Sequence, residues 1–98
     1  MEGIIPRTIS LSKIYPNPFN SSVAIEVENE SGQGVEIDVY DITGRWVDTI
    51  YSGWLNPGFH RFLWRATDES DHASSSGVYL VNLRGERNII SKTVVLLR

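Results

Sequence analysis

The chain has 98 residues, a formal net charge of −3 and no cysteine. This length suits one small domain, and the longest apolar run, Val94–Leu97, is too short to cross a bilayer, so no membrane insertion is expected. Lys and Arg are scattered along the chain, which argues against nucleic-acid binding. The absence of cysteine excludes disulfide frameworks and thiolate metal sites.

Residue preferences indicate β structure. Val, Ile, Thr, Phe, Trp and Tyr together number 34, whereas Ala occurs 3 times. Such β-branched and aromatic residues suit a pleated, half-buried surface. Apolar and polar residues alternate between turn residues, dividing the chain into about seven short strands. This spacing predicts an all-β antiparallel sandwich or barrel.

Three strands are predicted in the first part of the chain. Thr8–Ile14 is the first, and it ends because Pro16-Asn17-Pro18 fixes the backbone and removes two donors. Ser22–Glu28 follows, with one apolar and one polar face. After an expected loop at Ser31–Gly34, Val35–Tyr40 alternates with the same clarity, with Asp38 on its polar face.

The next two strands are separated by turn segments. Asp41-Ile42-Thr43-Gly44 has the Asp and Gly of a turn, and Arg45–Tyr51 is the predicted fourth strand. Ser52–Pro57 is expected to be a turn, and Phe59–Arg65 is the fifth strand. The side chains of that strand predicted to point inward are those of His60, Phe62 and Trp64.

The last two strands, Val78–Arg84 and Ile89–Leu97, flank Gly85–Asn88 and form the strongest hairpin signal. Thr67–Ser76 has no Val, Ile, Leu or aromatic residue and is expected to be an exposed, mobile loop. Residues 1–10 are expected to comprise an N-terminal tail, in part left over from expression, and the start of the first strand, with the domain at 11–98. The predicted core includes Val23, Ile25, Val27, Val35, Ile37, Val39, Phe62, Trp64, Tyr79 and Val81.

No catalytic, cofactor or metal site is predicted. The only histidines, His60 and His72, lie in a strand and in a Ser-rich loop, and no nucleophile motif accompanies them. Asp68, Glu69 and Asp71 offer oxygen ligands for calcium, but their spacing lacks the order of an EF-hand, which favours a solvated acidic loop.

Trp54 is the one tryptophan whose context suggests exposure. Because aromatic faces stack on pyranose rings, it is an alternative sugar platform. Tryptophan in so small a sandwich is more often core filling.

Four blocks of sequence occur in a recognisable order. They are Tyr15–Asn20 (YPNPFN), Val39–Arg45 (VYDITGR), Ser76–Leu80 (SGVYL) and Val94–Arg98 (VVLLR). Together they resemble the C-terminal sorting domain of cargo of the type IX, or Por, secretion system. That family is related in fold to the immunoglobulin-like domain of the flagellar hook-capping protein. The resemblance implies an immunoglobulin-like antiparallel β-sandwich of about seven strands over 11–98.

Each block also has a physical role of its own. The prolines Pro16 and Pro18 predict a rigid, extended corner that lets Phe19 plug the gap between the sheets. Gly44 suits a positive φ next to the Asp41 turn. Tyr79 offers a buried ring whose hydroxyl needs a partner.

The resemblance implies a non-catalytic secretion signal. It implies that the domain ends a larger exported cargo protein, is read by the secretion translocon and is removed by a sortase-like peptidase. The cargo then passes through the periplasm to the cell surface or medium. The residues implied in recognition are Asp41, Gly44, Arg45, Gly77, Tyr79, Lys92 and Arg98.

Within that role, the last strand is expected to be an edge strand whose free backbone groups pair with a receptor, steered by Lys92 and Arg98. The chain departs from the family in two places. Ser21 and Ser22 follow Asn20 where a proline is common, and Asp68-Glu69-Ser70-Asp71 replaces an Asp-x-x-Gly turn. The alternatives are a carbohydrate-binding module and a passive immunoglobulin-like spacer of a secreted enzyme.

Overall fold

The computed structural model describes residues 8–98, so residues 1–7 of the segment 1–10, expected to hold the N-terminal tail and the start of the first strand, lie outside the described residues. The described chain is all-β, and none of its segments forms a helix that could span a membrane. The strands are β1 (Ile9–Tyr15), β2 (Val23–Asn29), β3 (Gln33–Asp41), β4 (Trp46–Leu55), β5 (Gly58–Trp64), β6 (Gly77–Arg84) and β7 (Ile89–Leu96).

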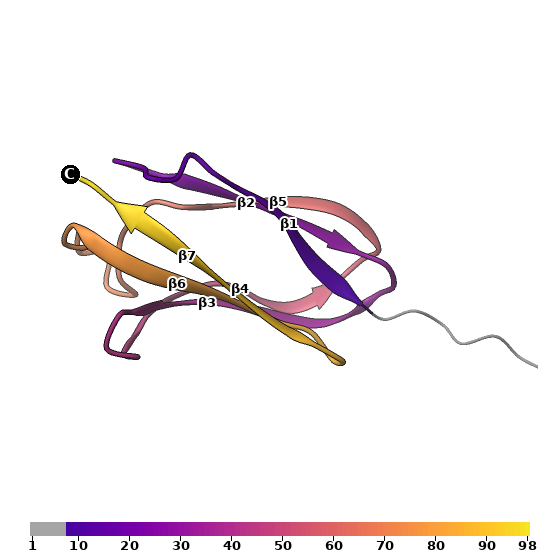
Figure 1. Ribbon diagram of the computed structural model, residues 1–98. Coiled ribbons are helices and arrows are strands. Elements are labelled where there is room, and N and C mark those ends of the chain that lie inside the picture. The colour runs from indigo at the N-terminus through magenta and orange to yellow at the C-terminus, as the bar shows by residue number, and fades with distance from the viewer. Residues whose placement is uncertain (1–7) are drawn as a thin grey trace, which may run out of the picture.

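The strands form two antiparallel sheets packed face to face (Figure 1). One sheet has the order β1-β2-β5 and the other has the order β4-β3-β6-β7. The predicted seven-stranded immunoglobulin-like sandwich is confirmed, with β4 paired to β3 and not to β5. The edges β1 and β7 lie on one side of the sandwich, and the edges β4 and β5 lie on the other.

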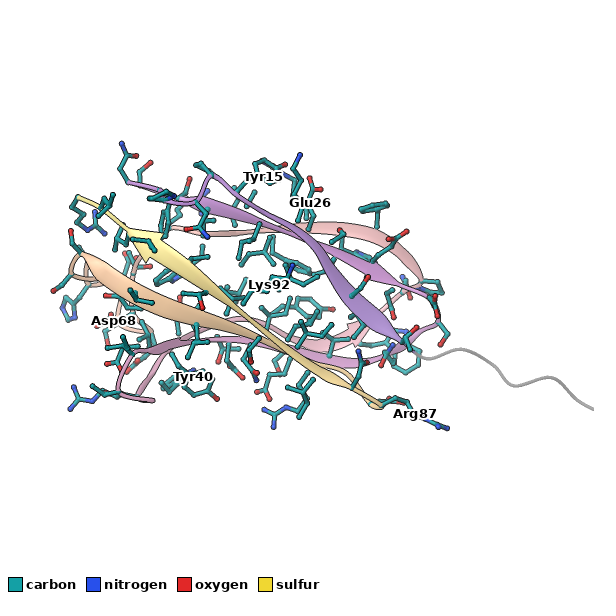
Figure 2. All side chains as sticks on the ribbon, in the orientation of Figure 1. Tyr15, Glu26, Tyr40, Asp68, Arg87 and Lys92 are labelled. Carbon is teal, nitrogen blue, oxygen red and sulfur yellow. The ribbon has the colours of Figure 1, made fainter. Side chains whose placement is uncertain are left out.

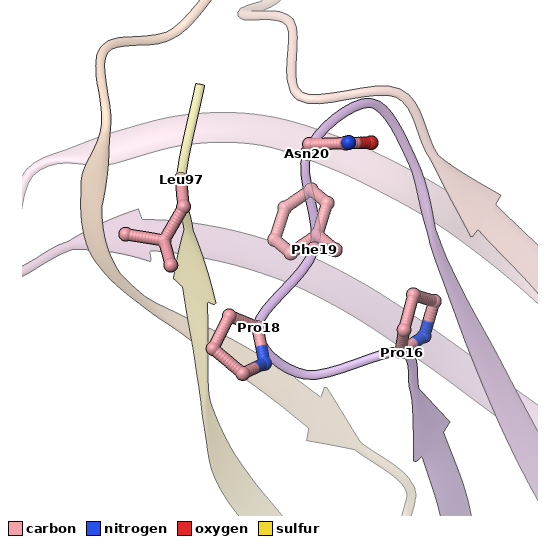
Figure 3. Close-up of a pocket in the computed structure, with 5 residues that line it drawn as sticks. All are labelled: Pro16, Pro18, Phe19, Asn20 and Leu97. Carbon is pink, nitrogen blue, oxygen red and sulfur yellow. The ribbon is translucent and has the colours of Figure 1, made fainter.

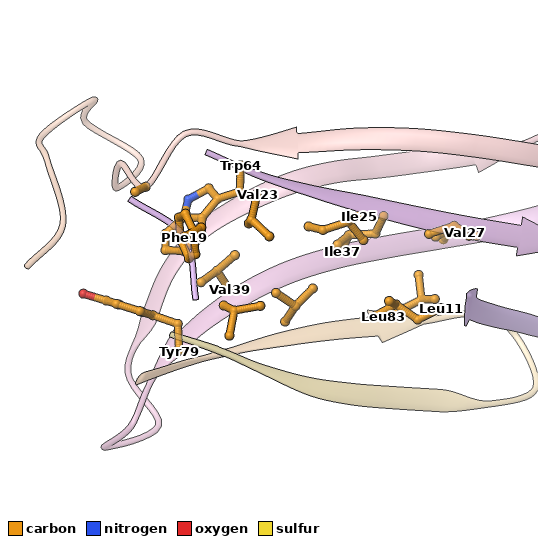
Figure 4. Packing of buried hydrophobic residues seen from close by; sticks show 14 of the residues in the cluster. Leu11, Phe19, Val23, Ile25, Val27, Ile37, Val39, Trp64, Tyr79 and Leu83 are labelled. Atoms are coloured by element: carbon orange, nitrogen blue, oxygen red, sulfur yellow. The ribbon is translucent and has the colours of Figure 1, made fainter. Parts of the chain in front are cut away.

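The core lies between the sheets, as the alternation predicted (Figure 4). Nine of the ten predicted core residues are buried, and Phe62 is partly buried against the same cluster. At one end of the core, the Phe19 ring lies 5.8 Å from that of Trp64, which in turn lies 5.2 Å from that of Tyr79. Phe19 therefore fills the gap between the sheets, as expected of the plug.

Two strands extend beyond their predicted limits. The predicted loop at Ser31–Gly34 is wrong in its second half because β3 begins at Gln33, opposite Leu55 of β4. Leu55 is buried, so β4 continues through most of the segment predicted as a turn. Gln33 is also buried: its Nε2 donates to Asn29 Oδ1 at 2.7 Å, and its Oε1 accepts from the Glu86 amide at 2.8 Å.

The prediction that Asp38 lies on the polar face of its strand is also wrong, because this residue is buried on β3. Its Oδ1 accepts a hydrogen bond from Thr49 Oγ1 at 2.6 Å, and its Oδ2 lies 3.8 Å from Arg84 Nη2. The β3–β4 register shifts between Ile37 and Asp38, which places Thr49 opposite Asp38. Burial of this carboxylate is tolerated because both oxygens have partners.

The two phenylalanines Phe19 and Phe59 give a matched test of the core. Phe19 is 3% exposed and Phe59 is 66% exposed. We expect Phe19→Ala to lower the free energy of unfolding by about 3–5 kcal/mol, because it leaves a cavity beside Trp64. Phe59→Ala should change it by less than about 0.5 kcal/mol. Denaturant unfolding of both variants measures the difference, and equal losses would contradict the assigned plug.

Candidate functional site

Six of the seven residues implied in recognition gather at one end of the sandwich. This end holds the β3–β4 turn, the β5–β6 loop and the C-terminal end of β7 (Figure 1). A hollow of about 370 Å³ lies there, and its lining includes Asp41, Arg45, Asp68 and Tyr79. The seventh residue, Lys92, lies along β7, away from the end that carries Asp68 (Figure 2).

The Asp41 turn is held by its own side chain. Asp41 Oδ1 accepts from the Thr43 hydroxyl at 2.6 Å, from the Thr43 amide at 2.9 Å and from the Arg45 amide at 3.0 Å. The Thr43 hydroxyl, followed by the Arg45 amide, holds the pKa of Asp41 below its ordinary value. Gly44 has the expected positive φ, at 89°. The turn therefore presents the Arg45 side chain from a hydrogen-bonded backbone.

A second turn in the β5–β6 loop repeats this arrangement. Asp68 Oδ1 accepts from the Ser70 amide at 2.9 Å and from the His72 amide at 2.8 Å. The His72 amide is the main cause that lowers the pKa of Asp68, with Ser70 adding to it. The Asp71 amide donates to the Asp68 carbonyl at 2.9 Å, as Gly44 does to Asp41 at 3.0 Å. Asp71 has a φ of 67°, so it adopts the conformation of the glycine that it replaces.

The loop that carries this second turn is exposed, as predicted, but it is attached to the sheet. The Glu69 amide donates to the Val47 carbonyl of β4 at 3.1 Å. The contact brings acidic residues close to Asp48. Burial raises the pKa of Asp48, and the nearby charges of Asp68, Glu69 and Asp71 add to the increase.

Tyr79 secures the loop from the core side. Its ring is buried, and its hydroxyl donates to the Ser75 carbonyl at 2.6 Å, which confirms that the hydroxyl has a partner. The neighbouring Trp64 indole donates to the Thr67 carbonyl at 3.0 Å. The loop is thus tied at both ends to aromatic residues of the core.

Arg98 is engaged within the chain. Its Nε donates to the Ser74 carbonyl at 2.7 Å, and its Nη2 donates to the Ala66 carbonyl at 2.9 Å. Its amide donates to Ser76 Oγ at 2.9 Å. Ala66 is buried and has a left-handed φ of 58°. Arg98 therefore fixes the loop that forms the hollow, and its role as a steering charge stays a prediction.

The expectation that the backbone groups at the end of β7 are unpaired is wrong. The Phe19 amide donates to the Val95 carbonyl at 2.9 Å, and the Leu97 amide donates to the Phe19 carbonyl at 2.8 Å. Asn17 also bonds the same edge through its side-chain amide. The corner that reaches this edge is bent at Pro16, Asn17 and Pro18 and is not extended as expected. The Tyr15–Pro16 and Asn17–Pro18 peptide bonds are both cis.

Beside the corner lies a hollow of about 310 Å³, which is lined by Pro16, Pro18, Phe19, Asn20 and Leu97 (Figure 3).

Trp54 lies at the opposite end of the sandwich and is 62% exposed, in agreement with its expected exposure. Part of its indole is in close contact with Gly32, where an added Cβ would lie 2.6 Å from Trp54 Cζ2. Trp46 is 45% exposed, so Trp54 is not the one exposed tryptophan as predicted. Of the three tryptophans, only Trp64 is buried in the core.

The histidines and the acidic side chains were the remaining candidates for a metal or catalytic site. Within residues 8–98, no three His, Asp or Glu side chains are placed so that they could hold a metal ion. His60 bonds the Asn56 carbonyl at 2.8 Å, and His72 Nδ1 lies 3.6 Å from Asp68 Oδ2. The other oxygen of this carboxylate, Asp68 Oδ1, accepts from two backbone amides of its own turn.

Comparison with known families identifies a sorting-domain signature. A family model described as a secretion system C-terminal sorting domain matches residues 13–56. The matched segment includes the first two sequence blocks, Tyr15–Asn20 and Val39–Arg45. The resemblance seen in the sequence is thereby confirmed. No curated protein matches the chain.

Two solved structures share the fold. One is dimeric latent PorU from Porphyromonas gingivalis, with a TM-score of 0.78 and 19% identity, and the match covers 99% of this chain and 10% of that one. The other is PorZ, a surface component of the type IX secretion system of the same organism, with a TM-score of 0.59, 22% identity, and coverage of 88% and 11%. This chain thus spans about a tenth of each protein.

The Asp71 turn predicts a stabilising substitution. Because Asp71 adopts a left-handed conformation near other acidic groups, Asp71→Gly should raise the free energy of unfolding by about 0.5 kcal/mol. Asp71→Asn removes only the charge and serves as the matched control. In the first turn, Gly44→Ala should lower the same quantity by about 1 kcal/mol. Denaturant unfolding tests all three variants. A destabilised Asp71→Gly would contradict the conclusion that the Asp68 turn repeats the Asp41 turn.

A pH-dependent effect is expected at Asp48. A raised pKa means that the folded state favours the protonated acid, so the carboxylate destabilises the fold at neutral pH, and this penalty disappears as the pH falls through the raised pKa. Asp48→Asn keeps the oxygen that accepts from the Thr49 amide. It should stabilise the fold by about 0.5 kcal/mol at pH 7 and not at pH 3. An advantage that does not change with pH would contradict this cause.

Proposed function

We propose, from the sorting-domain signature that this chain carries over residues 13–56, that it targets a larger exported protein to the type IX secretion translocon. The observation that carries the proposal is the convergence of the family match with the clustering of motif residues at one end of the sandwich. The matched family is a sorting signal and not a catalytic domain, and whatever activity the exported protein has would belong to its other parts.

The end of the sandwich offers a recognition surface of defined chemistry. Arg45 is exposed on the Asp41 turn, next to Ile42 at 72% exposure and Trp46 at 45%. A guanidinium among exposed apolar side chains suits a partner that offers a carboxylate within an apolar patch. The hydrogen bonds of the two turns fix this surface before binding, which lowers the entropy cost of association.

The residues implied in recognition then divide by role. Arg45 supplies the contact, whereas Asp41 and Gly44 hold the turn that presents it. Tyr79 and Arg98 hold the β5–β6 loop that forms the other wall of the hollow. After recognition, the cargo would cross the outer membrane, and a sortase-like peptidase would remove the domain and attach the cargo at the surface or release it.

A reporter fusion tests the proposed function. The chain is joined to the end of a reporter that carries a Sec signal, and the reporter is localised in strains with and without the translocon. We expect the reporter at the surface or in the medium only in the strain that has the translocon. Equal export in both strains would contradict sorting. Retention of the reporter in the periplasm of both strains would indicate a passive spacer.

Substitutions of two arginines distinguish an effect on recognition from an effect on folding. Arg45 and Arg87 are both exposed, but they lie at opposite ends of the sandwich. We expect Arg45→Ala to reduce export of the fusion by roughly tenfold, the effect of one charged hydrogen bond. Arg87→Ala should leave export unchanged, and both variants should unfold at the wild-type denaturant midpoint. Equal export of the two variants would contradict the role given to Arg45.

A further inference from the structure

Two of the four edge strands of the sandwich are shielded by asparagine side chains. The edge of β7 bonds the Phe19 backbone and the Asn17 side chain. At the start of β1, Asn88 Nδ2 donates to the Ile9 carbonyl at 2.8 Å, and the Ile9 amide donates to Asn88 Oδ1 at 3.4 Å. The register of β1 with β2 then shifts after Leu11. Edges that are covered or irregular resist pairing with a further strand.

The edge of β4 is interrupted as well. Val47 and Ile50 have no partner in the register with β3, so the strand is bulged at two places. The Val47 carbonyl also accepts a hydrogen bond from the Glu69 amide at 3.1 Å. The edge of β4 therefore offers no long, regular stretch of backbone to a further strand.

The fourth edge strand, β5, is regular and open. All seven residues of Gly58–Trp64 pair with β2 in one unbroken register. Within residues 8–98, no hydrogen bond joins the backbone of β5 to any strand other than β2. The strand contains neither Pro nor Lys, the residues that commonly protect an edge. Its outer backbone groups are therefore placed as an added strand requires.

The side chains of β5 alternate between two kinds of surface. Phe59, Arg61 and Leu63 are exposed on the outer face, whereas His60 and Phe62 are half-buried on the core side. Phe59 is 66% exposed and Leu63 is 41% exposed. The outer face beside the open edge thus presents an apolar, a basic and an apolar side chain in succession.

Arg61 has no acidic partner in the part of the chain that the structure describes. Its Nε donates to the Tyr15 hydroxyl at 3.3 Å, and that hydroxyl donates to Glu26 Oε2 at 2.7 Å. The contact with Tyr15 orients the Arg61 side chain. No hydrogen bond to a described residue uses its two Nη atoms, so the guanidinium has donors left for a carboxylate.

The core side of the same edge borders a hollow. This hollow has a volume of about 210 Å³, and Ile50 of β4 and Leu63 and Trp64 of β5 are among the residues that line it. The rings of Tyr51 and Phe62 lie 5.2 Å apart and are only partly buried against the core. Inward side chains of an added strand would cover these apolar groups, so pairing would bury apolar surface as well as backbone.

We propose that the outer edge of β5 is a strand-addition site for an extended segment of a partner protein. The segment that fits has an acidic side chain opposite Arg61 and apolar side chains opposite Phe59 and Leu63, because charge and apolar contact both act between neighbouring strands. A second copy of β5 does not fit, since two edges paired around Arg61 would place two guanidinium groups side by side. The site uses none of the residues implied in sorting.

A peptide titration tests the proposal. The probe is Thr-Val-Thr-Glu-Thr-Val-Thr, which reads the same in both directions and so suits parallel and antiparallel pairing. We expect it to shift the amide resonances of β5 saturably and to slow the fastest-exchanging β5 amides roughly tenfold. The same peptide with every amide N-methylated keeps the side chains but has no backbone donor, and it should not bind. Equal binding of the methylated peptide, or no saturable shift in β5, would overturn strand addition.

Charge reversal tests the role of Arg61. A probe with lysine in place of glutamate should bind the wild type roughly fivefold more weakly than the first probe, because it sets a like charge against Arg61. Arg61→Glu should reverse the order of the two probes, and Arg61→Gln, which should abolish the preference, replaces it if that variant does not fold. Wild-type preference in the variant that folds would overturn the proposal.

The matched control is Arg87→Glu, which reverses another exposed charge, in the turn between β6 and β7. It changes the net charge of the chain as Arg61→Glu does but lies outside β5. We expect it to keep the wild-type order of the two probes. A reversed order in Arg87→Glu would show that net charge is the cause and would overturn the proposal.

Discussion

The insertion of Phe19 between the two sheets is the contact on which the rest of this end of the molecule depends. Its ring completes a row with Trp64 and Tyr79, and its backbone bonds the last strand. Trp64 and Tyr79 in turn hold the β5–β6 loop through the Thr67 and Ser75 carbonyls. The apolar core and the surface that we propose for recognition are therefore parts of one packed unit.

Two carboxylates of that surface serve the backbone. Asp41 and Asp68 each accept from amides two and four residues further along the chain, and each holds a left-handed fourth residue, Gly44 or Asp71. Acidic side chains at such positions are often interpreted as ligands. Here they replace the hydrogen bonds that a tight turn would otherwise leave unmade. What faces outward is the arginine that follows the first turn.

The sequence predicts the parts of this fold that depend on local pattern. Alternation identified the core strands, and the Asp-x-x-Gly spacing identified the first turn. Several of the errors lie where a polar side chain bonds a residue outside its own strand. Asp38 and Gln33 are buried because Thr49 and Glu86 reach them, and no local pattern encodes those contacts. The pairing of Asn17 with β7, 76 residues away, was missed for the same reason.

The direction of β1 gives the domain a spatial polarity. β1 begins at Ile9, next to the β6–β7 hairpin that holds Asn88, whereas the Asp41 turn and Arg98 lie at the other end (Figure 1). A polypeptide joined ahead of Ile9 would therefore leave the sandwich roughly 23 Å, the length of a seven-residue strand, from the two turns. A passenger attached there would start from the end of the sandwich opposite the two turns, so the fold sets the attachment point and the proposed recognition surface at opposite ends of one rigid body.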